Sequence, residues 1–248
     1  MKKNITKAIC VLTVIMLFSG CVFVSIGDPA ANNAVRAQGE RETYEIKTGT
    51  FSDIKIEGAF EIRYYAGSSD TVTLEVQPNI QKYIEVLVEN NELIVRSTRR
   101  ISYGLNKGMI LTVYAPALNQ ITIEGAGKFT AYDKITSSSL TLITRGAGSG
   151  KAELDVNNLT VNVSGAGSFE LSGKAETANI NLSGAGEIKA LSLQTSDAAI
   201  NMSGAGSIKV SCSGKLGIKA DGTGSIEYRG SPNVSLNTNG LVSVRQIN

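Results

Sequence analysis

Three carboxylates near the start of the sequence are spaced for acid–base chemistry. Asp53, Glu57 and Glu61 alternate along a segment with a strand-like pattern, which would let them share one face. Paired carboxylates of this kind cleave glycosidic bonds. The simpler interpretation is a solvated strand face, because charged side chains are mostly exposed. The chain contains no histidine, which excludes Ser-His-Asp and Cys-His catalysis and most zinc chemistry.

A second candidate for chemistry is the tripeptide Gly-x-Gly, which occurs six times. The pairs are Gly125 and Gly127, Gly146 and Gly148, Gly165 and Gly167, Gly184 and Gly186, Gly204 and Gly206, and Gly222 and Gly224. No copy has the third glycine of a dinucleotide-binding loop, and no Gly-Lys pair is followed by Ser or Thr. The calcium-binding nonapeptide repeat needs an aspartate two residues after its glycine pair, and every copy lacks it. We therefore expect no nucleotide, cofactor or metal, and we interpret these glycines as structural corners.

Two groups of side chains are candidates for a binding surface. Four basic residues lie in or beside a glycine-containing segment, where they suit an anionic polymer or an ordinary solvated loop: Arg96, Arg99, Arg100 and Lys107. Six of the eight tyrosines lie in the N-terminal half, either exposed for stacking on sugars or buried in strands: Tyr44, Tyr64, Tyr65, Tyr83, Tyr103 and Tyr114.

The N-terminus has the pattern of a bacterial lipoprotein signal over residues 1–20. Three lysines precede an uncharged apolar stretch from Ala8 to Phe18, and Ser19 and Gly20 then lead to Cys21. This order resembles the lipobox, in which a peptidase cuts before a cysteine that carries lipid. An uncleaved anchor helix and simple secretion are the alternatives, since apolar residues resume at Val22. We expect Cys21 to be lipidated and to attach the protein to a membrane.

The lipid places the protein in the cell envelope, on the extracytoplasmic side of a membrane. In a cell with two membranes, Val22 after the cysteine predicts the outer membrane. Residues 21–40 lack periodicity and are interpreted as a tether. The chain has 24 basic and 22 acidic residues, and the signal removes three lysines, so nothing favours nucleic acid as a partner. Cys212 should face inward as an inert thiol.

The glycine pairs also define a structural repeat of 18–21 residues. The first glycines lie 21, 19, 19, 20 and 18 residues apart, and Gly240 marks a worn seventh copy. Such a period indicates stacked units that bury a core only together. Around each pair apolar residues alternate, as in Val161, Val163 and Phe169, which is typical of half-buried strands. Each repeat is therefore expected to be a strand of about ten residues, with both glycines inward at a bend, and a polar return of about eight.

Strands that repeat without helices predict an all-β fold, a parallel β-helix over residues 41–248. Equivalent side chains should form ladders, with Asn162, Asn181 and Asn201 outside. Residues 41–118 read as opening coils and an N-terminal cap, with a hairpin at Asn90-Asn91 and Phe60 in place of a second glycine; a separate β domain is the alternative. We expect both ends of the helix to be covered. Polar strand residues, the C-terminal tail or a partner chain could cover the last coil, and we favour the tail.

Particular motifs resemble the putative auto-transporter adhesin, head GIN domain family of bacterial envelope proteins. The resemblance rests on Ser-Gly-Ala-Gly blocks such as 183–186, on the opening residues 51–58, on Pro116-Ala117-Leu118 and on residues 228–232. It covers roughly residues 51–234 and implies a right-handed parallel β-helix. Its name implies adhesion, but the resemblance carries no catalytic or binding residues.

Two functions remain open from the sequence. The first is a lipid-anchored, non-catalytic envelope protein whose β-helix binds a glycan or a surface protein. The second is a polysaccharide lyase or glycoside hydrolase, a class that also uses parallel β-helices and needs clustered acids in a groove. The outward positions of the repeats are mostly Asn, Ser and Thr, which favours the first. The oligomeric state is open.

Overall fold

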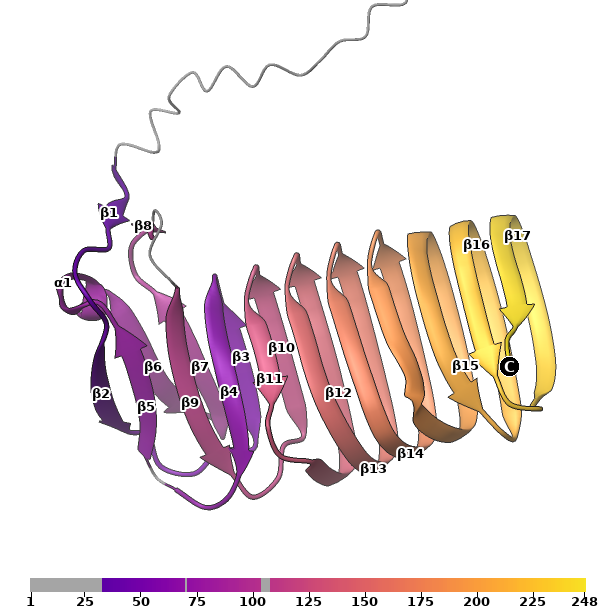
Figure 1. Cartoon of the computed structure of the whole chain (residues 1–248), viewed down its shortest axis with the longest axis horizontal. Helices are drawn as coiled ribbons and strands as arrows, with labels where there is room; N and C mark the ends of the chain where they lie inside the picture. The colour runs from indigo at the N-terminus through magenta and orange to yellow at the C-terminus, as the bar shows by residue number, and fades with distance from the viewer. Residues whose placement is uncertain (1–32, 70, 104–107) are drawn as a thin grey trace, which may run out of the picture. The chain divides into compact units, whose positions relative to one another are not determined.

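The repeats fold into the stacked coils of a parallel β-helix (Figure 1). The computed structural model describes residues 33–69, 71–103 and 108–248. Its elements are β1 (Val35–Arg36), β2 (Glu42–Lys47), β3 (Asp53–Glu57), β4 (Phe60–Ala66), β5 (Thr71–Val76), α1 (Pro78–Gln81), β6 (Ile84–Glu89), β7 (Glu92–Ser97), β8 (Ile101–Ser102), β9 (Met109–Ala115), β10 (Gln120–Gly125), β11 (Lys128–Ala131), β12 (Ile135–Gly146), β13 (Ser149–Gly165), β14 (Ser168–Gly184), β15 (Glu187–Cys212), β16 (Lys215–Arg229) and β17 (Asn233–Gln246).

The strand register follows the sequence repeat. Strands β12 to β17 pair in parallel, each with the next, and Gly146 lies opposite Gly165, which lies opposite Gly184. Asn181 donates a hydrogen bond to Asn162 (Nδ2···Oδ1, 2.9 Å), and Asn201 donates one to Asn181 (3.0 Å). The predicted β-helix and its outer asparagine ladder are confirmed.

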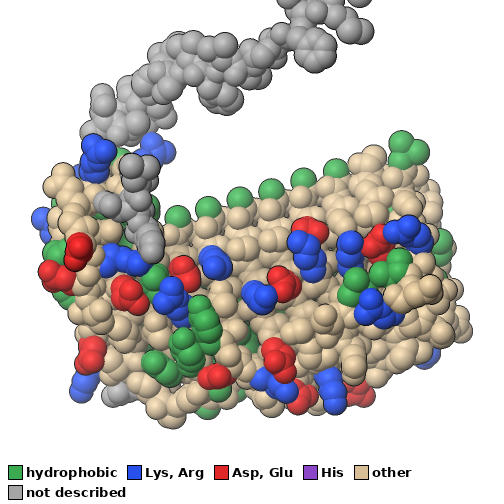
Figure 2. Space-filling model, viewed as in Figure 1, with side chains coloured by type: hydrophobic (Ala, Val, Ile, Leu, Met, Phe, Trp, Pro, Cys, Tyr) green, Lys and Arg blue, Asp and Glu red, His purple; other side chains and the backbone are tan. Residues whose placement is uncertain are grey.

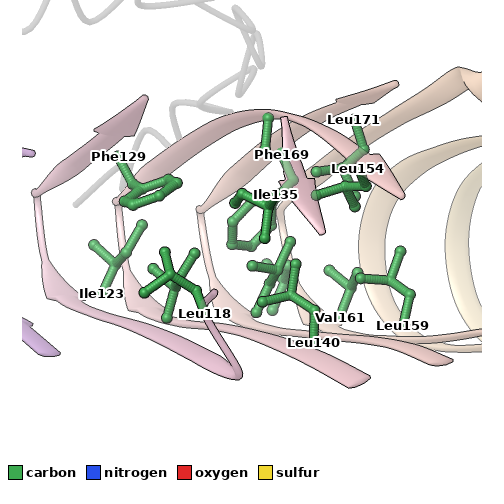
Figure 3. Packing of buried hydrophobic residues seen from close by; sticks show 14 of the residues in the cluster. Leu118, Ile123, Phe129, Ile135, Leu140, Leu154, Leu159, Val161, Phe169 and Leu171 are labelled. Carbon is green, nitrogen blue, oxygen red and sulfur yellow. The ribbon is translucent and has the colours of Figure 1, made fainter. Parts of the chain in front are cut away.

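Within one coil, buried and exposed side chains alternate on both sides of a second corner. In β13, Leu154 and Val156 are buried, Asn157 and Asn158 are exposed, and Leu159 begins the next buried series. Two successive exposed residues shift the phase of the alternation, so that both arms of the coil send apolar side chains into one core (Figure 3). The predicted polar return is wrong, because these residues form strand rather than loop. The apolar residues of this arm, such as Leu154 and Val156, belong to the core.

The first coil is formed by β3 and β4, with Gly58 at its corner. Strand β3 pairs with β10 and β4 pairs with β11, both in parallel, so Gly58 stacks below Gly125. Phe60 follows in the place of the second glycine and is buried. Residues 67–119 then form the N-terminal side of the stack, where β7 pairs with β3 and β9 pairs with β4, both in parallel, before the chain continues as β10.

Beyond β7 and β9, antiparallel strands cover the N-terminal end of the core. Strand β5 pairs antiparallel with β2 and β9, and β6 pairs antiparallel with β7 through a turn at Asn90 and Asn91. Both asparagines have positive φ, as a two-residue hairpin turn of this type requires. The short helix α1 adds the buried Ile80. The N-terminal part therefore has one more parallel layer, formed by β7 and β9, and a cap of the antiparallel strands β2, β5 and β6, as opening coils with a cap would predict.

The C-terminal end is open, contrary to the prediction that the tail would cover it. Strand β17 pairs with β16 alone among the described strands. Val234, Leu236 and Leu241 are 36%, 53% and 82% exposed, and Figure 1 shows no element beyond β17. The last residues continue the pairing with β16, and the Ile247 amide donates to the Tyr228 carbonyl oxygen (2.8 Å). The tail thus extends the last coil instead of closing it.

One compact unit extends over Ala34–Asn248 and contains all the described strands and the core cluster. The predicted tether is too long at its C-terminal end, because Val35–Arg36 pairs with β8 and Ala37 is buried. The predicted signal segment and Cys21 lie outside the described residues. Among the residues that are described, none forms a helix long and apolar enough to cross a membrane.

Candidate ligand-binding surface

The two glycines of each pair meet different obstacles. Gly165 has φ +123°, and a Cβ there would lie 2.5 Å from the Gly146 carbonyl oxygen in the coil below. Gly167 faces the core, where a Cβ would lie 2.3 Å from Thr144 Cγ2. The expectation that both glycines point inward is therefore wrong for the first of each pair, which is restricted along the stack, and in the last pair it is also wrong for Gly224, which is exposed and has φ +146°. Both obstacles are structural, and they fit the interpretation of the pairs as corners.

The three carboxylates do not share a strand. Asp53 and Glu57 lie on β3, whereas Glu61 lies beyond the Gly58 corner on β4. Lys55 pairs with Glu57 (Nζ···Oε1, 2.6 Å), and Arg63 pairs with Glu61 (Nε···Oε1, 3.1 Å). The prediction that they alternate along one strand is thus wrong, and two of the three are held in ion pairs.

The basic candidates are divided between a strand and a loop. Arg96 ends β7 and pairs with Glu85 on the neighbouring strand (Nε···Oε2, 2.7 Å). Arg99 lies over the Tyr83 ring, with Cζ 5.9 Å from its centroid. Arg100 follows in the same loop, and Lys107 lies outside the described residues. These contacts are typical of a solvated surface.

Four of the six tyrosine candidates have local structural contacts. Tyr64 is fully buried, donates to the Ala115 carbonyl oxygen (3.0 Å) and stacks on Phe129. Tyr44 donates to Glu42 (3.1 Å), and Tyr83 stacks with cations. Tyr103 is half-buried, and burial raises its pKa to about 12.

The remaining two tyrosines form a ladder with a third that was not considered from the sequence. Tyr65 on β4 stacks between Tyr114 on β9 and Tyr132, which follows β11. The ring centroids are 5.6 and 5.1 Å apart and the planes are inclined by 26° and 10°. Tyr114 is 38% exposed and Tyr132 is 53% exposed. Since Tyr65 covers one face of each outer ring, the ladder offers its ring edges, hydroxyls and outer faces to a ligand.

A basic hollow lies on the same three strands as the tyrosine ladder. It encloses ≈ 510 Å³ and is lined by side chains that include Arg41, Glu61, Arg63 and Lys128. Glu61, Arg63 and Tyr65 alternate along the outer face of β4, and Lys128 lies opposite Glu61 in the register. Figure 2 shows hydrophobic side chains beside acidic and basic ones on one face of the molecule. The hollow has three cations and one carboxylate.

The arginines of the hollow are held in place by local contacts. Arg41 donates to the Gly108 carbonyl oxygen (Nη1···O, 3.1 Å). Partial burial alone would lower the pKa of Arg63, but its hydrogen bond to Glu61 and the charges of Glu61, Tyr132 and Glu75 raise it above its ordinary value. Arg63 therefore stays cationic and fixed next to the ladder. We call the ladder and the hollow together the Tyr-Arg face; it consists of Arg41, Glu61, Arg63, Tyr65, Tyr114, Lys128 and Tyr132.

The Tyr-Arg face could be found only in part from the sequence. Glu61, Arg63 and Tyr65 at period two on one strand were a signal of a shared outer face. Nothing local links them to Tyr114 or Lys128, because these two residues reach β4 only through its pairing with β9 and with β11. Cys212, in contrast, is buried and forms no disulfide, and its inward orientation agrees with the prediction from the sequence.

Comparison with known proteins supports the fold and supplies a family. The family model described as putative auto-transporter adhesin, head GIN domain matches residues 50–232. No curated protein matches the chain. A solved putative adhesin from Bacteroides fragilis NCTC 9343 is similar, with 25% identity and a TM-score of 0.81, over 86% of this chain and all of that one.

Two further solved structures have the same fold at lower identity. A putative lipid binding protein from Parabacteroides distasonis ATCC 8503 is 23% identical, with a TM-score of 0.68, over 87% of this chain and all of its own. A putative adhesin from Parabacteroides merdae ATCC 43184 is 20% identical, with a TM-score of 0.63 and the same coverage. Because the family model spans most of the sequence, the chain belongs to the putative auto-transporter adhesin, head GIN domain family.

Proposed function

We propose that this protein is a non-catalytic binding protein of the bacterial cell envelope that recognises acidic glycans through its Tyr-Arg face. The observation that carries the proposal is the tyrosine ladder beside a hollow with three cations. Aromatic side chains combine an apolar ring with a polar tip, which suits the mixed surface of a sugar. Arginine pairs with carboxylate or phosphate through two parallel hydrogen bonds.

The family supports binding over catalysis, since its description is that of an adhesin. Two of the three acids that a lyase or hydrolase would need are held in ion pairs. Lys55 pairs with Glu57 and Arg63 pairs with Glu61, and the hollow of the Tyr-Arg face is lined by a single carboxylate, that of Glu61. The enzyme alternative is therefore not favoured by any site described above.

A glycan array and titration calorimetry test the proposed ligand class. We expect binding to glycans with carboxylate or sulfate groups, and weaker binding as salt is added. Tyr132→Ala and Lys128→Ala should each weaken binding by about tenfold, or ~1.4 kcal/mol. Tyr132→Phe, which keeps the ring, and Lys174→Ala, an exposed lysine on β14, serve as matched controls.

Three outcomes would count against the proposal. One is equal binding of neutral and acidic glycans, and another is an unchanged affinity in both alanine variants. The third is binding to vesicles of anionic phospholipid but to no glycan, which would assign the basic hollow to a lipid headgroup instead. Turnover of any glycan by the purified protein would restore the enzyme alternative.

We propose in addition that lipid on Cys21 attaches the protein to the extracytoplasmic side of a membrane, the outer one where two are present. The basic, apolar and small residues before Cys21 support this. Cys21→Ser should abolish both the incorporation of labelled fatty acid and the cleavage of the signal. A Cys21→Ser protein that is still labelled and correctly cut would refute the anchor.

A further inference from the structure

The open C-terminal end of the stack has the features of an interface. Strand β17 carries Val234, Leu236 and Val244 opposite the buried Leu216, Ile218 and Ile226 of β16, and Val242 opposite Gly224. In β17 these side chains are exposed or half-buried, because no further coil covers them. Figure 2 shows hydrophobic side chains at this end. Exposed apolar side chains on an unpaired strand edge mark a site for pairing with another chain.

The two ends of the molecule differ in how they are protected. At the N-terminal end, the edge strands β2 and β6 include Glu42, Glu45, Lys47, Glu85 and Glu89. Charges on an edge strand oppose pairing with other strands. In β17 the single charged residue is Arg245, which forms an ion pair with Glu227 on β16. The C-terminal edge thus lacks this protection, and a partner strand there meets almost no charge to desolvate.

The backbone of β17 presents one set of hydrogen-bonding groups at the open edge. The Asn233 and Ile247 amides donate back to the Gly214 and Tyr228 carbonyl oxygens. Since peptide groups alternate in direction along a strand, the even-numbered residues between them point their N–H and C=O groups at the open edge. These are also the residues whose side chains face the core. Gly240 lies near the middle of β17 and forms its corner, with arms of similar length on either side.

We propose that a second copy of this chain covers the open end, with β17 paired antiparallel to the partner's β17 about a two-fold axis at Gly240. In this register Leu236 lies opposite the partner's Val244, and Thr238 lies opposite the partner's Val242. Every core-facing residue meets a core-facing residue, so the two cores become continuous. Arg245 lies opposite the partner's Ser235 and far along the strand from the partner's Arg245, so like charges are kept apart.

The size of the proposed contact matches that of a stable interface. Seven even-numbered residues on each strand, from Val234 to Gln246, offer outward amides, which gives about 14 inter-chain hydrogen bonds in an antiparallel pair. Protein interfaces typically contain about 10. The contact uses the same surface on both copies, so it closes at a dimer and does not continue into a fibre.

Analytical ultracentrifugation of Ala34–Asn248, the compact unit, tests the proposal. We expect a monomer–dimer equilibrium in the micromolar to millimolar range that ends at the dimer. Leu236→Lys, which places a charge inside the contact, should weaken the dimer by about tenfold or more. Asn179→Lys adds the same charge to the exposed row of β14 and should leave the dimer unchanged. A monomer at all concentrations, or growth beyond the dimer, would overturn the proposal.

A mixed cross-linking experiment tests the register without depending on the folding of any core variant. Asn237 lies opposite the partner's Ser243 in the proposed pairing, and both are exposed in the monomer. An oxidised mixture of N237C and S243C proteins should form a cross-linked heterodimer, whereas either protein alone should not. Cys212 is buried and does not compete. Failure of the mixture to cross-link, or equal cross-linking of each single variant, contradicts the two-fold axis at Gly240.

Discussion

Gly184 illustrates how a corner residue is restricted by the neighbouring coil rather than by its own. It has φ +153°, and a Cβ at this position would lie 2.3 Å from the Gly165 carbonyl oxygen and 2.8 Å from the Gly165 nitrogen. Neither atom can move alone, because Gly165 is itself stacked on Gly146. A side chain at one corner therefore has to separate two coils, and the repeated glycines are a requirement of stacking.

The first prediction compares Gly184 with the residue before it. Gly184→Val should lower the free energy of unfolding by on the order of 1–3 kcal/mol or more, through strain and a backbone clash. Ser183→Ala, at an exposed neighbouring position, should cost well under ~1 kcal/mol. Chemical denaturation of both variants measures the difference. Equal unfolding midpoints for Gly184→Val and the unmodified protein would rule out the corner interpretation.

The second prediction concerns the alkaline limit of stability and Tyr103. Burial raises the pKa of this phenol from 10.0 to about 12. The folded state therefore holds the proton more tightly than the unfolded state, and the resulting stabilisation is complete below pH 10.0 and lost as the pH rises through about 12. Denaturation at a series of alkaline pH values should show this loss, and Tyr103→Phe should reduce it. An identical alkaline profile in the variant would contradict the assignment.

At the scale of the element, the long strands were predictable and the Tyr-Arg face was not. Val161, Val163 and Phe169 alternate with polar residues, and each copy repeats the pattern. The repeat length and this alternation are therefore enough to predict which side chains face the core. The arm that includes Leu154 was misjudged as a polar return, because its phase changes at Asn157-Asn158. Tyr65 and Tyr132 meet through the pairing of β4 with β11, which sequence spacing does not reveal.

The third prediction tests the asparagine ladder that links β13, β14 and β15. Asn181 donates to Asn162 and accepts from Asn201, so Asn181→Ala removes two side-chain hydrogen bonds. At about 0.5–1.5 kcal/mol each, the loss should be roughly 1–3 kcal/mol. Asn179→Ala changes an exposed asparagine on the same strand and should stay within about 0.5 kcal/mol. Thermal unfolding of the two variants measures this difference. Equal destabilisation of both would show that the ladder does not contribute to stability beyond an ordinary surface position.

At the scale of the whole molecule, the two ends of the stack differ in stability, because the first coil is covered by other elements and the last coil is not. The N-terminal coil packs against hairpins and α1, while the last coil packs on one side only. In a stack of repeats each unit is stabilised mainly by its neighbours, so a coil with one neighbour opens first. The open end is also where the proposed partner would supply the missing neighbour, which ties local stability to association.

The fourth prediction follows from the difference between the two ends of the stack, and native-state hydrogen exchange measures it. In the Leu236→Lys variant, which should be monomeric, the Val234 and Val244 amides face the open edge and should exchange fastest. Amides in β14, such as those of Ile180 and Leu182, lie between two coils and should exchange only through larger openings. At concentrations where the unmodified protein is dimeric, the β17 amides should gain protection while those of β14 change little. Uniform protection along the stack in the monomer would show that it opens as one cooperative unit. Unchanged β17 amides in the dimer would place its interface at another surface.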